Sequence, residues 1–382
     1  MYEKPMECKR CGNRDPAYFY KGHKGYYCRK CVRFSRILLE EEILPLDYEI
    51  AEGSEEYSFD YRLTDQQLEA SRKCVEGLKY ADVLLYCVCG AGKTEIAVAS
   101  ISEYLSRGLK VAYAISRREV VIELTKRFEK IFSNARVTGV YGGHHDELTG
   151  DLIVCTCHQL FRYYQTFDLL ILDEADAFPL KGNETLMNIS VNACKGRVLY
   201  STATVDDTLR KVMKRRPYRT VELYVRPSFK PLAVPGIFYL PKYAGLFVLY
   251  VLLRKTEGQC IIFTTSKKDC EVFYRIFSRF FSCTYVYADL PERKQHIEDF
   301  RDKKYRFIFA TTVLERGITI KNVSVIILNF AKIFDQSNLI QMLGRVGRGT
   351  DSLKGDAYVI SDHFDPDIRE TLKYLKKANS YL

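Results

Sequence analysis

The chain has 382 residues and a formal net charge of +10. That length exceeds what one hydrophobic core usually serves, so we expect two or three domains. Hydrophobic residues make up 47% of the sequence, which excludes a disordered chain. The longest apolar run, residues 245–253, is about half a membrane span, and the N-terminus lacks the apolar segment of a signal peptide. The sequence therefore predicts a globular cytoplasmic protein, and its positive charge favours a polyanionic partner.

Four cysteines near the N-terminus form a regular pattern. Cys8 and Cys11 make one C-x2-C pair, and Cys28 and Cys31 make a second pair after sixteen intervening residues. Paired thiols at this spacing are typical of a structural zinc site, in which four thiolates complete a tetrahedron and leave no open position. The sequence therefore predicts a small zinc-binding module over residues 1–36.

This module is strongly basic. Residues 1–36 contain ten Lys and Arg against three Asp and Glu, whereas residues 37–65 contain ten acidic residues against Arg62 alone. We interpret residues 37–60 as an acidic, solvated connector. Aromatic residues are interleaved with the cations, so the module is suited to stacking bases while Lys and Arg follow phosphates. The alternative is that these rings pack around the metal; they are Tyr18, Phe19, Tyr20, Tyr26, Tyr27 and Phe34.

Beyond the connector, short apolar runs alternate with helix-length segments such as residues 117–132. This alternation predicts right-handed βαβ units and parallel sheets buried on both faces. A less regular, proline-bearing stretch near residues 225–236 separates two α/β domains, over residues 61–228 and 229–382. The expected strands cover residues 82–88, 110–116, 151–157, 168–176 and 197–204 in the first domain and 259–266, 284–290, 306–312, 323–329 and 356–361 in the second.

The segment "YCVCGAGKTE", residues 86–95, follows the first expected strand and precedes a helical pattern. A phosphate-binding loop requires this strand–loop–helix context. Gly90 and Gly92 would let backbone amides turn toward phosphate oxygens, and the helix N-terminus adds its positive end. Lys93 would reach the β- and γ-phosphates of ATP, and the Thr94 hydroxyl would hold Mg²⁺. The predicted nucleotide contacts are Cys89, Gly90, Ala91, Gly92, Lys93, Thr94 and Glu95.

Acidic and basic residues farther along would complete a hydrolytic site. Asp173 and Glu174 end an apolar strand, where ligands bind in open α/β sheets. Asp173 suits a water-mediated Mg²⁺ contact, and Glu174 suits polarisation of the attacking water. Arg345 and Arg348 are three residues apart, so on one helical face they would point at a shared γ-phosphate. Such arginines stabilise charge in the transition state, with effects on the order of 10³–10⁵ in rate.

The segments "LTDQQ", "CGAGKT", "DEAD", "STAT", "TTVLERG" and "QMLGRVGR", in this order, resemble the motifs of superfamily 2 helicases over most of residues 60–350. The resemblance implies two RecA-like domains in tandem with ATP in the cleft between them. It implies that Gln67 contacts adenine, that Thr202 and Thr204 couple hydrolysis to the grip on nucleic acid, and that Gln341 completes the site with the arginines. The remaining expected contacts are Gly317 to nucleotide and Arg117, Gly142, Gly143, Thr311 and Thr312 to nucleic acid.

Finer features resemble the ComFA-type late competence helicases. They are the four-cysteine head, "VCGAGKTE", "SRREVVIEL", "CHQLFRYY", "DEADAFPL" and "LERGITI". This resemblance covers nearly the whole chain. It implies a cytoplasmic ATPase that uses ATP, Mg²⁺ and Zn²⁺, is stimulated by single-stranded DNA and helps draw transforming DNA into the cell. The implied partners are a phosphoribosyltransferase-like competence protein, the membrane DNA-uptake channel and proteins that handle single strands; homo-oligomer formation stays open.

Departures from related families leave alternatives open. The segment "QMLGRVGR" differs from the "HRIGRTGR" style of DEAD-box RNA helicases, and no strand-separating domain is evident after Gly349. Translocation along DNA is therefore favoured over unwinding. The alternatives are a primosome-like DNA helicase, a DEAD-box-like RNA helicase, and a zinc-dependent DNA-binding adaptor that uses ATP only as a clamp.

Three smaller signals are ambiguous in the sequence. The loop 141–147 would either place its glycine amides against a DNA backbone or form a plain surface loop. The basic run 214–219 would either touch phosphates or be solvated. Cys87 stands where phosphate loops commonly have their first glycine, and a redox switch through Cys87 or Cys89 is a further interpretation.

Overall fold

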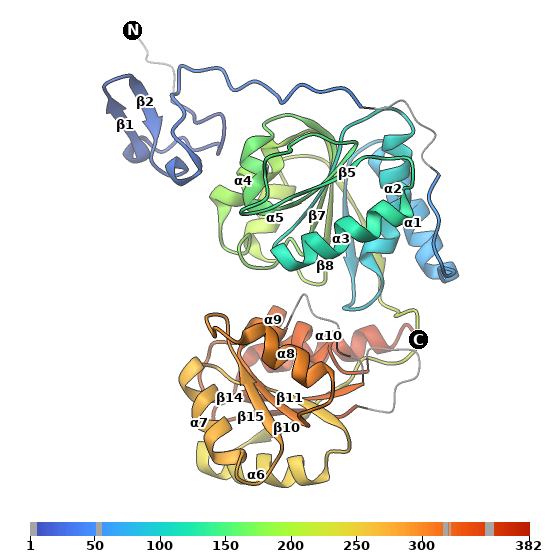
Figure 1. Ribbon diagram of the computed structural model, residues 1–382, viewed down its shortest axis with the longest axis vertical. Coiled ribbons are helices and arrows are strands. Elements are labelled where there is room, and N and C mark those ends of the chain that lie inside the picture. The colour runs from blue at the N-terminus through green and yellow to red at the C-terminus, as the bar shows by residue number, and fades with distance from the viewer. Residues whose placement is uncertain (1–5, 51–55, 316–319, 321, 348–354) are drawn as a thin grey trace. The chain divides into compact units, whose positions relative to one another are not determined.

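The computed structural model describes residues 6–50, 56–315, 320, 322–347 and 355–382. Its contacts divide the chain into two compact units, one of residues 1–87 and 92–223 and the other of residues 224–382 with the short segment 88–91. The four-cysteine module therefore belongs to the first unit, and Figure 1 shows it at the blue end of the chain.

The first unit is built around a seven-stranded parallel sheet in the order β5-β6-β4-β7-β8-β3-β9, as the alternation of apolar runs predicted. Aliphatic runs form its central strands because both faces are covered by helices. The strands are β3 (Asp82–Cys87), β4 (Val111–Ile115), β5 (Val137–Val140), β6 (Leu152–Thr156), β7 (Phe167–Asp173), β8 (Cys194–Thr202) and β9 (Tyr218–Leu223).

Helices cover both faces of this sheet (Figure 1). One face carries α1 (Asp65–Leu78), α2 (Lys93–Leu105) and α3 (Arg118–Ile131). The other carries α4 (Glu184–Asn192), α5 (Asp207–Met213) and the 3-10 helix η3 (Cys157–Arg162). The first helix starts where it does because Thr64 and Gln67 exchange side-chain and backbone hydrogen bonds, forming a capping box.

The second unit contains a six-stranded parallel sheet in the order β10-β15-β14-β11-β13-β12. Figure 1 shows α6 and α7 below this sheet and α8, α9 and α10 above it. The strands are β10 (Gly236–Tyr239), β11 (Gln259–Phe263), β12 (Cys283–Val286), β13 (Phe307–Ala310), β14 (Val323–Asn329) and β15 (Ala357–Ser361). The helices are α6 (Lys242–Lys255), α7 (Lys267–Phe277), α8 (Arg293–Arg301), α9 (Gln336–Leu343), α10 (Pro366–Asn379) and the 3-10 helix η4 (Thr312–Leu314).

The longest apolar run lies inside α6, where Leu249 and Leu253 are fully buried against the sheet of the second unit. Across the described ranges, no helix combines the length and apolar character needed to cross a bilayer.

The basic run 214–219 is largely exposed, two of its arginines have acidic partners, and a contact with phosphates stays a prediction. The side chain of Arg215 pairs with Glu184 at 2.9 Å, and the guanidinium of Arg216 lies 3.4 Å from a carboxylate oxygen of Asp82. The end of the run enters β9, which the sequence did not predict. Exposed polar residues dominate this strand because it pairs on one side only, at the sheet edge.

The four-cysteine module contains an antiparallel hairpin of β1 (Phe19–Gly22) and β2 (Gly25–Cys28). Two short 3-10 helices flank it, η1 (Pro16–Tyr18) and η2 (Val32–Phe34). Its cysteines come from the segment before η1, from the end of β2 and from the residue before η2, so the folded hairpin brings the two C-x2-C pairs together.

Candidate nucleotide and metal sites

The phosphate loop has the backbone that its glycines predicted. Gly90 and Gly92 have φ angles of 83° and 85°, a left-handed conformation that favours glycine. A Cβ at Gly92 would also collide with the side-chain amide nitrogen of Gln67. Lys93 begins α2, whose N-terminus has no side-chain cap, so its first N–H groups are suited to an anion. The local structure therefore fits a loop that cradles phosphates.

The two predicted Mg²⁺ ligands lie together in the first unit. Asp173 ends β7, and its Oδ1 accepts hydrogen bonds from the Ser201 hydroxyl at 2.8 Å and from the backbone N–H of Glu174 at 3.0 Å. Its Oδ2 accepts a hydrogen bond from the Tyr113 hydroxyl at 2.8 Å. That same hydroxyl lies 3.4 Å from the Thr94 hydroxyl. Tyr113 and Ser201 were not among the predicted site residues.

Burial dominates the electrostatics of this site. It raises the pKa of Asp173, while the nearby Lys93 ammonium opposes that rise. The carboxylate is 5% exposed, so its ionised form needs a cation or donors close by. Lysine, hydroxyls and a divalent ion are the groups that meet this need.

Glu174 has a φ of 51°, which is unusual for a residue with a side chain. Strained backbone of this kind is often found at functional sites. Glu174 follows Asp173, the last residue of β7, and turns the chain at the carboxyl end of this central strand, where ligands bind in open α/β sheets. Glu174 is half-buried, and its role in polarising the attacking water stays a prediction.

The predicted coupling residues contact the acidic segment. The Thr204 hydroxyl donates to Asp176 Oδ2 at 2.5 Å, and the Thr202 hydroxyl donates to the backbone carbonyl of Thr204 at 2.6 Å. The end of β8 is thereby joined to the last residue of the D-E-A-D segment. Whether these threonines also respond to nucleic acid stays a prediction.

Gln67 and Glu95 have partners that the sequence did not reveal. Gln67 closes the capping box of α1, and its amide lies beside the phosphate loop at Gly92. Glu95 Oε1 accepts hydrogen bonds from the Tyr61 hydroxyl at 3.0 Å and from the Arg127 guanidinium at 2.5 Å. No sequence pattern points to Arg127, because it reaches Glu95 from a different helix.

Cys87, the residue that leaves β3 for the loop, is fully buried. Burial raises the pKa of its thiol to about 12, so the reactive thiolate is scarce at neutral pH. This argues against a redox switch through Cys87.

The structure places only some of the site residues that the sequence predicted in the second unit. Gln341 lies on α9 and is 4% exposed. Arg345 follows the end of that helix at Leu343, so the expected single helical face does not extend to it; its Nε donates to the backbone carbonyl of Glu315 at 3.1 Å. Thr311 and Thr312 lie half-buried at the start of η4. Gly317 and Arg348 lie outside the described residues.

The loop 141–147 forms a tight turn. Tyr141 and His144 exchange two backbone hydrogen bonds of 2.9 Å, which leaves Gly142 and Gly143 exposed at the tip. The guanidinium of Arg118 lies 4.9 Å from the Tyr141 ring centre. Its neighbour Arg117, a predicted nucleic-acid contact, is the N-cap residue of α3. A nucleic-acid contact at this turn stays a prediction.

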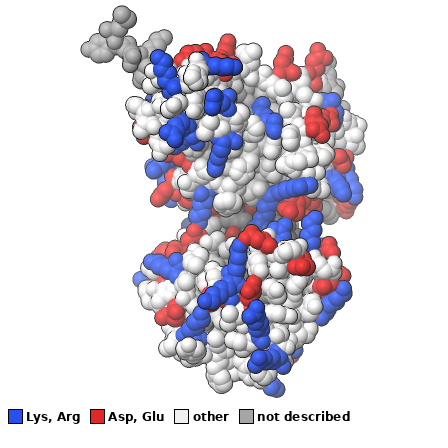
Figure 2. Space-filling model, turned by 60° about the vertical axis from the view of Figure 1, so that its left-hand side comes forward, with Lys and Arg blue, Asp and Glu red and all other residues white. Residues whose placement is uncertain are grey.

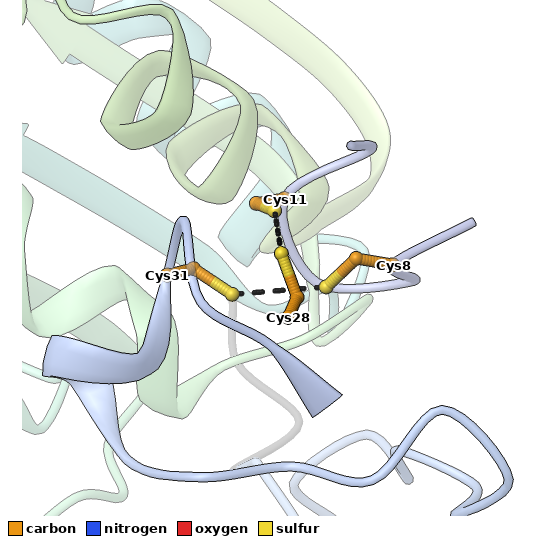
Figure 3. Close-up of side chains that lie close together, drawn as sticks. All are labelled: Cys8, Cys11, Cys28 and Cys31. Carbon is orange, nitrogen blue, oxygen red and sulfur yellow. Dashed lines mark hydrogen bonds between the residues drawn. The ribbon is translucent and has the colours of Figure 1, made fainter. Parts of the chain in front are cut away.

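The four predicted metal ligands converge, as Figure 3 shows. All four sulfurs are buried and lie within 4.8 Å of one another, and two of their separations are 3.7 Å and 3.8 Å. Four sulfurs about 2.3 Å from a central zinc ion would be about 3.8 Å apart. The arrangement therefore fits a closed, structural zinc site. The sulfurs belong to Cys8, Cys11, Cys28 and Cys31.

The module is docked on the first unit through α4 and η3. The Asn188 side chain donates to the backbone carbonyl of Cys11 at 2.9 Å, and the Asn192 side chain donates to that of Arg10 at 3.0 Å. The ring of Phe34 packs 5.7 Å from that of Phe161 in η3. The metal loops are thus held against the helix that lies between β7 and β8.

The outer surface of the module is basic and aromatic. Figure 2 shows Lys and Arg side chains gathered at the upper left of the view. Tyr18 and Tyr20 are 40% and 52% exposed, and the Lys30 ammonium lies 5.2 Å from the Tyr18 ring centre. The exposed cations of the described part of the module are Lys9, Arg14, Lys21, Lys24, Arg29, Lys30, Arg33 and Arg36.

Comparisons with known proteins identify two helicase domains in this chain. Residues 64–212 match the DEAD/DEAH box helicase domain, and residues 243–350 match the helicase conserved C-terminal domain. Competence protein ComFA of Bacillus subtilis is 31% identical over 97% of this chain and 85% of its own length. Competence protein ComFA of Streptococcus pneumoniae is 29% identical over 97% of this chain and 90% of its own length. A structure of S. cerevisiae Dbp5 bound to RNA and ADP BeF3 covers 84% of this chain and 92% of its own, with a TM-score of 0.58 and 20% identity, and shows the fold alone.

Proposed function

The chain belongs to the ComFA family of competence proteins, and on that premise we propose that it uses ATP to move along single-stranded DNA during DNA uptake. Its DEAD/DEAH-box and C-terminal helicase domains make it an ATP-dependent helicase of superfamily 2, and so a nucleic-acid-dependent ATPase. What we propose beyond this is that the ATPase moves along single-stranded DNA and that this movement serves DNA uptake.

One observation carries the proposal of a working motor. The first unit brings Thr94, Asp173 and Glu174 together, and Ser201 of β8 donates a hydrogen bond to Asp173. A protein that used ATP only as a clamp would need neither a carboxylate placed to polarise water nor a link from it to a neighbouring strand.

A single-stranded nucleic acid is the polymer that the surface chemistry favours, and membership of the ComFA family supports DNA over RNA. Exposed tyrosines beside Lys and Arg offer rings for bases and cations for phosphates, and neither contact requires a particular base. The four-cysteine site supports this surface, because zinc bound there would hold the hairpin and its flanking loops together. At the ATP site, Mg²⁺ would neutralise phosphate charge beside Asp173.

The test measures ATP turnover with single-stranded DNA, single-stranded RNA or duplex DNA of equal length. We expect single-stranded DNA to stimulate turnover most. Lys93→Ala and Glu174→Gln should each lower the stimulated rate by roughly 10²–10⁴-fold, because they remove a phosphate contact and the water-polarising group. Glu129→Gln, a change on the exposed face of α3, is the matched control and should leave the rate unchanged.

Three outcomes would contradict the proposal. Stronger stimulation by RNA would favour an RNA helicase. ATP turnover that no nucleic acid stimulates would exclude a motor that moves along nucleic acid. Turnover that survives both site changes would mean that the hydrolytic centre lies elsewhere.

A further inference from the structure

Tyr113 lies in the middle of β4 and is fully buried. This strand pairs with β7, and Tyr113 lies opposite Ile171, two residues before Asp173. Its ring packs 5.2 Å from that of Phe128 in α3, on the same face of the sheet as α2. The neighbouring strand thus directs a phenol toward the acidic end of β7.

The hydroxyl of Tyr113 lies between the two predicted Mg²⁺ ligands. It donates to Asp173 Oδ2 at 2.8 Å and lies 3.4 Å from the Thr94 hydroxyl. The other carboxylate oxygen is already held by Ser201 and by the backbone N–H of Glu174. Tyr113 therefore donates a hydrogen bond to Oδ2 of Asp173, and the same hydroxyl lies beside that of Thr94.

We infer that Tyr113 is a positioning residue for Mg²⁺ at the ATP site, because its hydroxyl orients the Asp173 carboxylate toward the ion. A hydrogen bond to an ionised carboxylate is stronger than one between neutral groups and fixes both distance and direction. Outer partners of this kind typically tune the affinity of a metal site. The inference adds a residue to the proposed ATP site, and it does not depend on which nucleic acid the protein moves along.

A plainer interpretation is that the hydroxyl merely finds an acceptor in the core. Buried tyrosines generally need a partner for their hydroxyl, and Asp173 supplies one. The two interpretations differ in their consequences. A packing role predicts an effect on stability alone, whereas a positioning role predicts an effect on the Mg²⁺ requirement.

Tyr113→Phe removes the hydroxyl and keeps the ring against Phe128. The measurement is binding of a fluorescent ADP analogue at increasing Mg²⁺, which requires neither turnover nor DNA, followed by the Mg²⁺ dependence of ATP turnover. We expect the Mg²⁺ concentration at half-saturation to rise roughly tenfold in both, the equivalent of one hydrogen bond to a charged group. Binding of the analogue in excess EDTA should be unchanged, and turnover should largely recover at saturating Mg²⁺.

Tyr200→Phe is the matched control. Tyr200 is equally buried, but it packs on the other face of the sheet, in the apolar cluster that includes Leu209 and Val212. The Tyr200→Phe variant should leave the Mg²⁺ concentration at half-saturation (the Mg²⁺ midpoint) unchanged. The inference is overturned by an unchanged midpoint in Tyr113→Phe or by an equal shift in Tyr200→Phe. Weaker binding to the same degree with and without Mg²⁺, or a melting temperature lower by more than about 10 °C, would likewise assign the hydroxyl to packing.

Discussion

Arg10 is 2% exposed, and both terminal nitrogens of its guanidinium have acceptors within the four-cysteine module. It donates to the backbone carbonyl of Cys31 at 2.6 Å and to that cysteine's sulfur at 3.2 Å. It also donates to the carbonyls of Phe34 and Ser35. Four thiolates around a divalent ion carry a net negative charge, so a buried arginine beside them both neutralises charge and fixes the loop.

We predict that Arg10→Gln accelerates zinc release. Loss of the charge-assisted hydrogen bond to the Cys31 sulfur should weaken metal affinity roughly 10–100-fold, as is typical of outer partners of a metal site. Transfer of zinc to a chelating dye measures this. Arg14→Gln, which removes an exposed ion pair with Glu7, is the control and should not change the rate. Equal rates in all three proteins would contradict the prediction.

The glycines of the phosphate loop allow a second test. Gly92→Ala should abolish nucleotide binding, because a Cβ would displace the side chain of Gln67 in addition to straining the backbone. Gly108→Ala is a matched control, since Gly108 has a φ of 63° with open space around it. It should cost about 1 kcal/mol of unfolding free energy and leave nucleotide binding intact. Denaturant unfolding and titration with an ADP analogue measure the two effects.

Among the elements, η3 makes the docking of the four-cysteine module sensitive to pH. His158 lies in η3, with its ring 6.3 Å from that of Phe34. Burial, and secondarily the charge of Arg33, lower the pKa of His158 below its usual 6.5. The folded protein therefore favours the neutral imidazole. This contribution to stability is present above pH 6.5 and is lost as the pH falls through the folded-state pKa.

His158→Gln should remove this pH dependence. Between pH 7.5 and pH 5.5, the wild-type protein should lose more unfolding free energy than the variant. His23→Gln, at an exposed position of the hairpin, should behave like the wild type. Unfolding in denaturant at both pH values measures the difference, and equal losses in wild type and His158→Gln would exclude this role of His158.

Elements with a strong local signal could be predicted from the sequence, and contacts between distant segments could not. The phosphate loop, the acid pair at the end of β7 and the four cysteines each have fixed spacing, so their chemistry can be recognised without a fold. Tyr113 could not be recognised, because its role depends on β4 lying beside β7 in the sheet. The short strand β5 and the edge strand β9 have no clear apolar alternation, and Asn188 has no motif that would reveal its contact with Cys11.

At the scale of the whole molecule, the contacts of the module with α4 and η3 lead us to predict that loss of zinc also destabilises these two elements. Removal of zinc by a strong chelator should raise hydrogen exchange in residues 6–36 and also in α4 and η3, because side chains of both elements hold the metal loops. Exchange in the sheet of the second unit should not change. Mass spectrometry of exchange in the presence and absence of chelator measures this. Loss of protection confined to residues 6–36 would instead indicate that the four-cysteine module is stable or unstable independently of α4 and η3.

The contact between Asn188 and Cys11 also sets an order of events during synthesis. The two residues are 177 positions apart, so the cysteines leave the ribosome long before their docking helix exists. At about 5–20 residues per second, that interval is roughly 10–35 s. The hairpin therefore has that interval in which to bind its metal and fold before α4 is made, and a chain that lacks zinc at that point would offer α4 a module without ordered metal loops.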